Sequence, residues 1–202
     1  INRMKKMHFL LAVIILLASQ INCYSQIQKG DFTITYNESG TGYVRSFYMY
    51  VPADYDSLKS YPLLYAWHGS GMPGNDMRTF MHSVDSNIKG IICCPDVNGI
   101  TTNEQLNTMI NESLKYLNKY NIDITKKIIT GFSMGGNYAF QIGLLNPANF
   151  QGIIGLSPAI GSADFTTTMW SNIKSIRMAT ILGTLDINWS AVNALMIDIL
   201  KK

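Results

Sequence analysis

Apolar and polar positions along the chain follow two alternating patterns. Short runs of apolar, aromatic or β-branched residues that end in glycine, proline or polar residues are typical of strands. The expected strands cover residues 31–36, 43–51, 63–67, 91–94, 127–130, 152–156 and 178–182. The first two read as antiparallel strands joined by a turn, whereas helical patterns separate the later ones. This order predicts an α/β fold with a mostly parallel sheet flanked by helices.

Three segments between the strands have the period of an α-helix. The expected helices cover residues 102–120, 134–145 and about 190–200. The apolar face of the first consists of Leu106, Ile110, Leu114 and Leu117. Its start fits a capping box in two registers, Thr101 with Glu104 or Thr102 with Gln105.

The first 25 residues have the pattern of a signal peptide. Lys5 and Lys6 precede the unbroken apolar run 9–18, which is too short to span a bilayer. Small residues at 23 and 25 fit cleavage after Ser25. A buried helix of the domain and a lipid anchor on Cys23 are the alternatives. We therefore expect residues 1–25 to be removed, which implies a secreted or periplasmic protein with no stable membrane insertion after cleavage.

The composition favours one folded domain over residues 26–202. Apolar residues make up 47% of the chain and charged residues 14%, which excludes a disordered chain. Three of the 16 basic residues lie in the first six positions, and the remainder equal the 13 acidic residues in number. A body without net charge offers no electrostatic basis for binding nucleic acid. Cys93 and Cys94 are neighbours on an expected strand and should be two separate buried thiols, and no Cys/His spacing predicts a metal site.

The strongest chemical motif is Gly131-Phe132-Ser133-Met134-Gly135-Gly136. It lies between an expected strand and an expected helix, which is the setting of a nucleophile elbow. Glycines on both sides of Ser133 allow the tight turn that raises the serine hydroxyl above the sheet. The helix N-terminus favours negative charge there, so the Met134 N–H is a candidate oxyanion donor. The alternative is an ordinary glycine-rich turn with a structural serine.

The chain resembles the α/β-hydrolases. The run 43–52, then Tyr61-Pro62-Leu63-Leu64 and His68-Gly69, resembles the start of exported esterases of the polyhydroxybutyrate-depolymerase and feruloyl/acetyl-xylan-esterase group. The elbow at Ser133 is the one those enzymes show. The resemblance extends from about Phe32 to the C-terminus and implies the α/β-hydrolase fold.

The resemblance assigns roles to the loop after the strand 63–67. An H-G motif at this place shapes the oxyanion loop in α/β-hydrolases. It makes the backbone N–H of Ser70 the second oxyanion donor. His68 precedes the nucleophile in the chain, so it is interpreted as a loop-shaping residue and not as the base. A surface histidine after a strand is the alternative.

A carboxylate follows the last expected strand. Asp186 lies 53 residues after Ser133, and the α/β-hydrolase order of nucleophile, acid and base makes it the candidate acid. Such an acid holds the base's imidazole in one tautomer. A helix-capping aspartate is the alternative reading. Asp164 is the second candidate acid and Asp96 the third.

No histidine follows Asp186. The three histidines of the chain are His8, His68 and His82. The resemblance implies a catalytic histidine after one further strand, so we expect the domain to be incomplete at its C-terminus. A serine without its base is a weak nucleophile, and the 202-residue chain is therefore expected to be nearly inactive.

Together these features predict a serine carboxylic-ester hydrolase that works through an acyl-enzyme. Export and the resemblance point to extracellular carbohydrate-linked or polyester substrates. The mechanism needs no cofactor and no metal. A serine peptidase of the same fold and a catalytically inactive binding protein are the alternative functions.

Overall fold

A computed structural model describes residues 27–38, 41–84, 89–100 and 102–202. The expected signal peptide lies outside the described residues. The described strands form one seven-stranded sheet in the order β1-β2-β4-β3-β5-β6-β7. Their bounds are β1 (Gly30–Asn37), β2 (Val44–Val51), β3 (Tyr61–Trp67), β4 (Ile91–Pro95), β5 (Ile122–Phe132), β6 (Gly152–Leu156) and β7 (Arg177–Ile181). All seven strands predicted from apolar runs are present.

The sheet begins with an antiparallel hairpin and continues as a parallel sheet. β1 pairs antiparallel with β2, and β2 pairs antiparallel with β4. The pairs β4–β3, β3–β5, β5–β6 and β6–β7 are parallel. The carboxyl ends of five neighbouring strands therefore meet at one edge of the sheet. In such sheets, side chains that act on a ligand gather at this edge.

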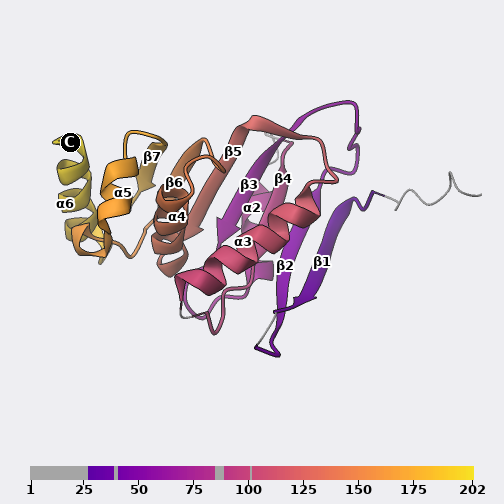
Figure 1. Cartoon of the computed structure of the whole chain (residues 1–202), viewed down its shortest axis with the longest axis horizontal. Coiled ribbons are helices and arrows are strands. Elements are labelled where there is room, and N and C mark those ends of the chain that lie inside the picture. The colour runs from indigo at the N-terminus through magenta and orange to yellow at the C-terminus, as the bar shows by residue number, and fades with distance from the viewer. Residues whose placement is uncertain (1–26, 39–40, 85–88, 101) are drawn as a thin grey trace, which may run out of the picture.

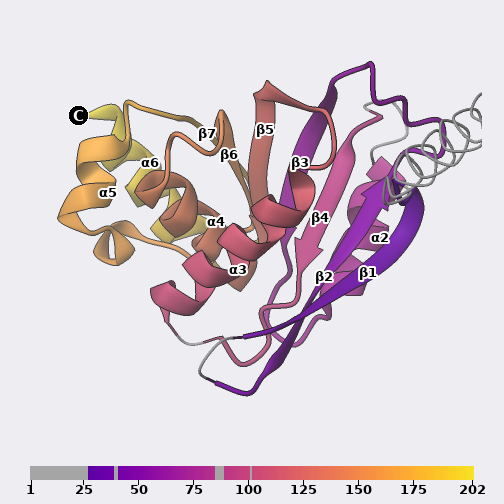
Figure 2. The same ribbon diagram turned by 45° about the vertical axis from the view of Figure 1, so that its right-hand side comes forward.

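Helices cover both faces of the sheet (Figure 1). They are α2 (Gly74–Val84), α3 (Asn103–Leu117), α4 (Met134–Leu145), α5 (Thr167–Asn172) and α6 (Trp189–Leu200), with a short 3₁₀ helix, η2 (Ser162–Asp164). Figure 2 shows α3 and α4 on one side of the sheet and α2 on the other. The capping box of α3 joins Thr102 and Gln105, the second of the two predicted registers.

Two apolar cores fill the space between sheet and helices. The larger core lies under α3 and α4 and includes Tyr65, Trp67 and Cys93. The smaller lies under α2 and includes Cys94. The two cysteines are buried free thiols on opposite faces, as predicted from their adjacency on a strand.

The structure differs from the sequence predictions at the start of β5 and in α2, α5 and η2, three elements that were not predicted. β5 starts at Ile122, five residues before the predicted start, because its first half passes through charged residues and its register with β3 shifts between Tyr61 and Leu63. Helix α2 was not predicted. Its buried residues are only Gly74, Met77 and Met81, which is too sparse an apolar pattern to identify a helix from sequence.

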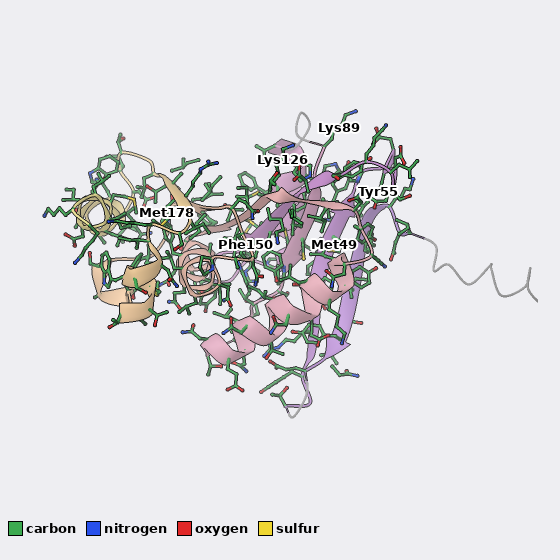
Figure 3. The ribbon with its side chains drawn as sticks, turned by 45° about the horizontal axis from the view of Figure 1, so that its top comes forward. Met49, Tyr55, Lys89, Lys126, Phe150 and Met178 are labelled. Carbon is green, nitrogen blue, oxygen red and sulfur yellow. The ribbon has the colours of Figure 1, made fainter. Side chains whose placement is uncertain are left out.

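An apolar groove of about 480 Å³ lies across the sheet. Leu64, Ile128, Ile154 and Ala179 line it from four adjacent strands. Met178 on β7, the last described strand, and Met49 on β2 lie toward opposite ends of the sheet (Figure 3).

No helix within the described parts of the chain combines the length and apolar character needed to cross a membrane.

Candidate active site

Ser133 stands in a sharp turn between β5 and α4. Its φ is 52° and its ψ is −116°, a conformation that non-glycine residues rarely adopt. A Cβ on Gly131 would lie 2.1 Å from the Gly135 carbonyl oxygen, and a Cβ on Gly135 would lie 2.3 Å from the Trp67 carbonyl oxygen. Only glycine fits at these two positions, so the backbone passes close to itself and forms the elbow that the motif predicts.

Backbone hydrogen bonds hold the turn, while the serine hydroxyl stays free. The Ser133 N–H donates to the Leu156 carbonyl at 3.0 Å, and the Ser133 carbonyl accepts from the Ala159 N–H at 2.9 Å. Both partners come from the segment that ends β6. No described group hydrogen-bonds the Ser133 hydroxyl, and the side chain is partly exposed. The hydroxyl is thus presented at the carboxyl edge of the sheet without an internal partner.

The loop after β3 lies against the elbow. Trp67 at the end of β3 pairs with Gly131 of β5 in the parallel ladder, so the segments that follow β3 and β5 leave the sheet side by side. A Cβ on Gly69 would lie 2.9 Å from Cδ1 of Phe132. Ser70 follows as an exposed residue in a turn closed by the Met72 N–H and the Gly69 carbonyl. The Ser70 segment is therefore adjacent to the nucleophile candidate.

His68 is a fully buried, neutral residue that shapes this loop. Its Nδ1 lies 2.8 Å from the Gly69 carbonyl oxygen, and its Nε2 lies 2.8 Å from the Val97 nitrogen. The backbone N–H must donate to Nε2, so the ring proton resides on Nδ1 and donates to Gly69. Asp96 Oδ1 lies 3.3 Å from Nε2, but an unprotonated nitrogen has no hydrogen to give it. Both ring nitrogens have structural partners, which supports the prediction that His68 is not the base.

Asp186 lies in the turn after β7. Its Oδ1 accepts from the Asn188 N–H at 2.8 Å. The Ser157 hydroxyl and then the Asn188 N–H hold the pKa of the Asp186 carboxyl below its usual value. The N-cap residue of α6 is Asn188 and not Asp186, so the carboxylate does not cap that helix.

The two other candidate acids have local roles in the structure. Asp164 Oδ2 accepts from the Gly161 N–H at 2.7 Å and closes the 3₁₀ turn η2. Asp96 Oδ1 accepts from the Asn98 N–H at 3.0 Å in the loop after β4. Asp186 is the one of the three that follows β7, two strands beyond β5, with β6 between them.

His82 lies far along the sheet from Ser133. It belongs to α2 and stacks on Tyr50 of β2, with a centroid separation of 3.7 Å. Its Nδ1 is 3.7 Å from Asp31 of β1. Strands β4 and β3 separate β2 from β5. His8 lies outside the described residues, so none of the described histidines is placed to act as a base for Ser133.

Two neighbours of Asp186, Ser157 and Asn188, were not predicted from the sequence. Ser157, directly after β6, has a φ of 44°, and Asn188 donates its side-chain amide to the Ser157 carbonyl at 3.1 Å. Serine before proline at the end of an apolar strand is the only sequence signal for the first, and nothing in the sequence marks the second. Within the described part of the chain, no cluster of three or more His, Cys, Asp or Glu side chains is arranged to hold a metal ion.

Comparison with protein families gives one match. The model of the family Esterase, described as "Putative esterase", matches residues 39–194. The matched range includes Ser70, Ser133, Met134 and Asp186. No curated protein matches the sequence significantly.

Many solved structures share the fold. A thermostable esterase superposes with a TM-score of 0.66 at 19% identity, over 85% of this chain and 52% of its own. The chain thus spans about half the length of that protein. A ferulic acid esterase gives a TM-score of 0.63 at 19% identity, over 86% of this chain and 87% of its own. A feruloyl esterase module from Clostridium thermocellum, complexed with sinapinate, gives 0.64 at 18% identity, over 85% and 73% of the two chains.

Proposed function

Since the chain belongs to the esterase family, whose model matches residues 39–194, we propose that it acts on carboxylic esters through an acyl-enzyme on Ser133. The observation that carries this proposal is the turn at Ser133. A serine with a φ of 52° joins a strand to a helix, and its hydroxyl has no hydrogen-bond partner among the described residues. A strained turn that presents a free hydroxyl is the geometry of a nucleophile elbow.

Two backbone N–H groups are the proposed oxyanion donors. Met134 is the first residue of α4, where N–H groups have no intrahelical acceptor. Ser70 lies in the loop that packs against Phe132. Neither N–H donates to a described acceptor. Donors that are unpaired before the reaction are available for the charge that develops on the ester oxygen.

The reaction has two steps. The Ser133 oxygen attacks the ester carbonyl carbon while a base accepts the hydroxyl proton, and the negative oxygen of the tetrahedral intermediate receives hydrogen bonds from Ser70 and Met134. The bond from carbon to the alcohol oxygen then breaks, and the alcohol leaves with that proton. Water attacks the acyl-enzyme in the same way, which releases the carboxylic acid and restores the hydroxyl.

Among the residues that the structure describes, no histidine is placed to serve as the base for Ser133. Asp186 is the proposed acid partner of such a base, and the described histidines are engaged elsewhere. Removal of one member of a catalytic triad lowers the rate by several orders of magnitude. The 202-residue chain is therefore proposed to acylate slowly and to be nearly inactive in turnover.

Carbohydrate-linked or polyester substrates outside the cell are the proposed class. The N-terminal apolar segment is typical of exported proteins. The structural relatives include a ferulic acid esterase and a feruloyl esterase module bound to sinapinate. An ester of a hydroxycinnamic acid is accordingly the first substrate to test.

Fluorophosphonate labelling tests the nucleophile without requiring turnover. The 202-residue chain should label slowly at Ser133, and Ser133→Ala should abolish the labelling. Ser171→Ala, in which an exposed serine on α5 is removed, serves as the matched control and should label like the parent. Intact-mass spectrometry with peptide mapping identifies the labelled residue. Labelling that persists in Ser133→Ala would contradict the proposal.

Ester hydrolysis tests the role of the missing base. Release of nitrophenol from p-nitrophenyl acetate and of ferulate from methyl ferulate should be close to the uncatalysed rate. Turnover at ordinary esterase rates that Ser133→Ala abolishes would show that this chain already contains a base.

A catalytically inactive binding protein is the second candidate function. The observation that favours it is that His68 and His82 are both held away from the Ser133 hydroxyl. A folded chain that does not label at Ser133 but retains affinity for feruloylated sugar would favour binding over catalysis.

A further inference from the structure

Ser157 occupies a position between the two proposed catalytic residues. It is the first residue after β6, which lies between β5 and β7 in the sheet. Its N–H donates to the Ile181 carbonyl at 2.7 Å, which ties it to the end of β7. The order of the three strands along the carboxyl edge therefore places Ser157 between Ser133 and Asp186.

The backbone of Ser157 is strained. Its φ of 44° lies in the left-handed region, which serine enters at an energetic cost and glycine enters freely. Such strain persists where other interactions determine the conformation. At Ser157 these interactions lead to the Asp186 turn.

Asn188 joins Ser157 to Asp186 by two hydrogen bonds. Its backbone N–H donates to Asp186 Oδ1 at 2.8 Å, and its side-chain amide donates to the Ser157 carbonyl at 3.1 Å. Asn188 is the N-cap residue of α6, yet its side chain makes no capping hydrogen bond to that helix. The side chain that would ordinarily stabilise the helix start is used to hold the strand end.

The Ser157 side chain completes the arrangement, because it is the first cause of the lowered pKa of the Asp186 carboxyl. The carboxylate thus accepts a hydrogen bond from the Asn188 backbone N–H and is also influenced by the Ser157 side chain. The depressed pKa of Asp186 has these two groups as its causes, with Ser157 first, and no lysine or arginine contributes. Such interactions both orient the Asp186 carboxylate and favour its ionised form.

We propose that Ser157 and Asn188 are positioning residues that hold the Asp186 carboxylate in one orientation at the carboxyl edge of the sheet. This inference rests on the proposed function, in which Asp186 orients the base. The acid of a triad must remain ionised and aligned when the imidazole becomes charged. Two groups that act on the same carboxylate meet both requirements before any base is bound.

The test is a titration of Asp186 in the full 202-residue chain, followed by NMR of ¹³C-labelled aspartate carboxyl groups. Ser157→Gly removes the hydroxyl and also relieves the positive φ, so this variant should fold. Ser157→Ala removes the hydroxyl and keeps the strain. In both variants, the pKa of Asp186 should rise toward the ordinary aspartate value.

Two further variants make the test specific. Asn188→Ala retains the backbone N–H to Asp186 but loses the tie to the Ser157 carbonyl, so the rise should be smaller than in Ser157→Gly. Ser162→Ala is the matched control, because the Ser162 hydroxyl donates to a different carboxylate, Asp198, at 2.7 Å. The Asp186 titration should be the same in this control as in the parent.

An Asp186 titration that does not change in folded Ser157→Gly would overturn the positioning role. A circular-dichroism spectrum and a dispersed amide NMR spectrum establish independently that Ser157→Gly is folded. A changed Asp186 titration in the folded variant is then not caused by unfolding. The proposed function fails by a separate measurement. If the parent chain does not label at Ser133, the proposed hydrolysis is overturned, and with it the role of Ser157 and Asn188 in catalysis.

Discussion

Gly135 lies against the backbone of Trp67, and a Cβ placed on this glycine would stand 2.3 Å from the Trp67 carbonyl oxygen. The next carbonyl, that of His68, would be 2.5 Å away. The first turn of α4 is thereby pressed onto the end of β3. This contact places the elbow next to the loop that carries Ser70.

Gly135→Ala should destabilise the fold strongly. The methyl group would meet two backbone carbonyls that cannot rotate away, so we expect a loss of about 3 kcal/mol or more in unfolding free energy. Gly183→Ala is the control, because nothing lies within 4 Å of the Cβ position there. Urea unfolding followed by circular dichroism compares the two. Equal midpoints for both variants would show that the contact at Gly135 is not the constraint described.

His68→Ala should cost about 2–4 kcal/mol of stability. The substitution leaves the buried Val97 N–H without its acceptor and opens a cavity under the Gly69 loop. His82→Ala removes a partly exposed ring from Tyr50 and should cost less than about 1 kcal/mol. Thermal and urea unfolding measure both. A His68→Ala protein as stable as His82→Ala would contradict the structural role assigned to His68.

Loss of the buried ion pair between Glu38 and Arg45 should lower the free energy of unfolding far more than loss of a surface ion pair. The two side chains are 4% and 7% exposed and lie 3.0 Å apart, and Arg45 also donates to the Asn98 carbonyl. Glu38→Ala leaves a buried guanidinium without its counter-charge, which should cost about 3–5 kcal/mol. Asp56→Ala, which removes the exposed partner of Lys59, should cost less than about 1 kcal/mol. Urea midpoints of similar size in the two variants would count against this assignment.

Stability should depend on pH through Asp123. Hydrogen bonds from the Thr125 hydroxyl, Lys126 and the Thr125 N–H lower the pKa of Asp123 to about 2. A depressed carboxyl pKa stabilises the fold above the unfolded-state value near 4, and this contribution is lost as the pH falls toward 2. Thr125→Val should therefore be less stable than the parent at neutral pH, and the difference should shrink as the pH falls from about 4 to 2. A difference that stays constant over this range would contradict the linkage.

The strands and the elbow could be predicted from the sequence because their signals are local. Apolar runs locate the strands, and the glycines around Ser133 are required by contacts within a few residues. The early part of β5 was missed because its pairing with β3 is irregular and its residues are charged. Helix α2 was missed because only one stripe of methionines is buried.

The surroundings of Asp186 could not be predicted from the sequence. Ser157 is 29 positions earlier in the chain, and its contribution depends on a positive φ and on a bond across neighbouring strands. Asn188 looks like an ordinary helix cap, yet its amide is directed elsewhere. Such pairings follow from the register of the parallel sheet, which a single sequence does not reveal.

The glycines of the elbow are required by close backbone contacts and not by the proposed reaction. Gly131 and Gly135 are required for the chain to close on itself, whereas the Ser133 hydroxyl has no structural partner among the described residues. Over evolutionary time, selection for folding alone would therefore retain the glycines and allow the serine to drift. A descendant that has lost hydrolysis would still display the glycine signature. A search of genomes for the glycines of this motif would therefore find proteins that share the fold, and only the serine would distinguish those under selection for the proposed hydrolysis.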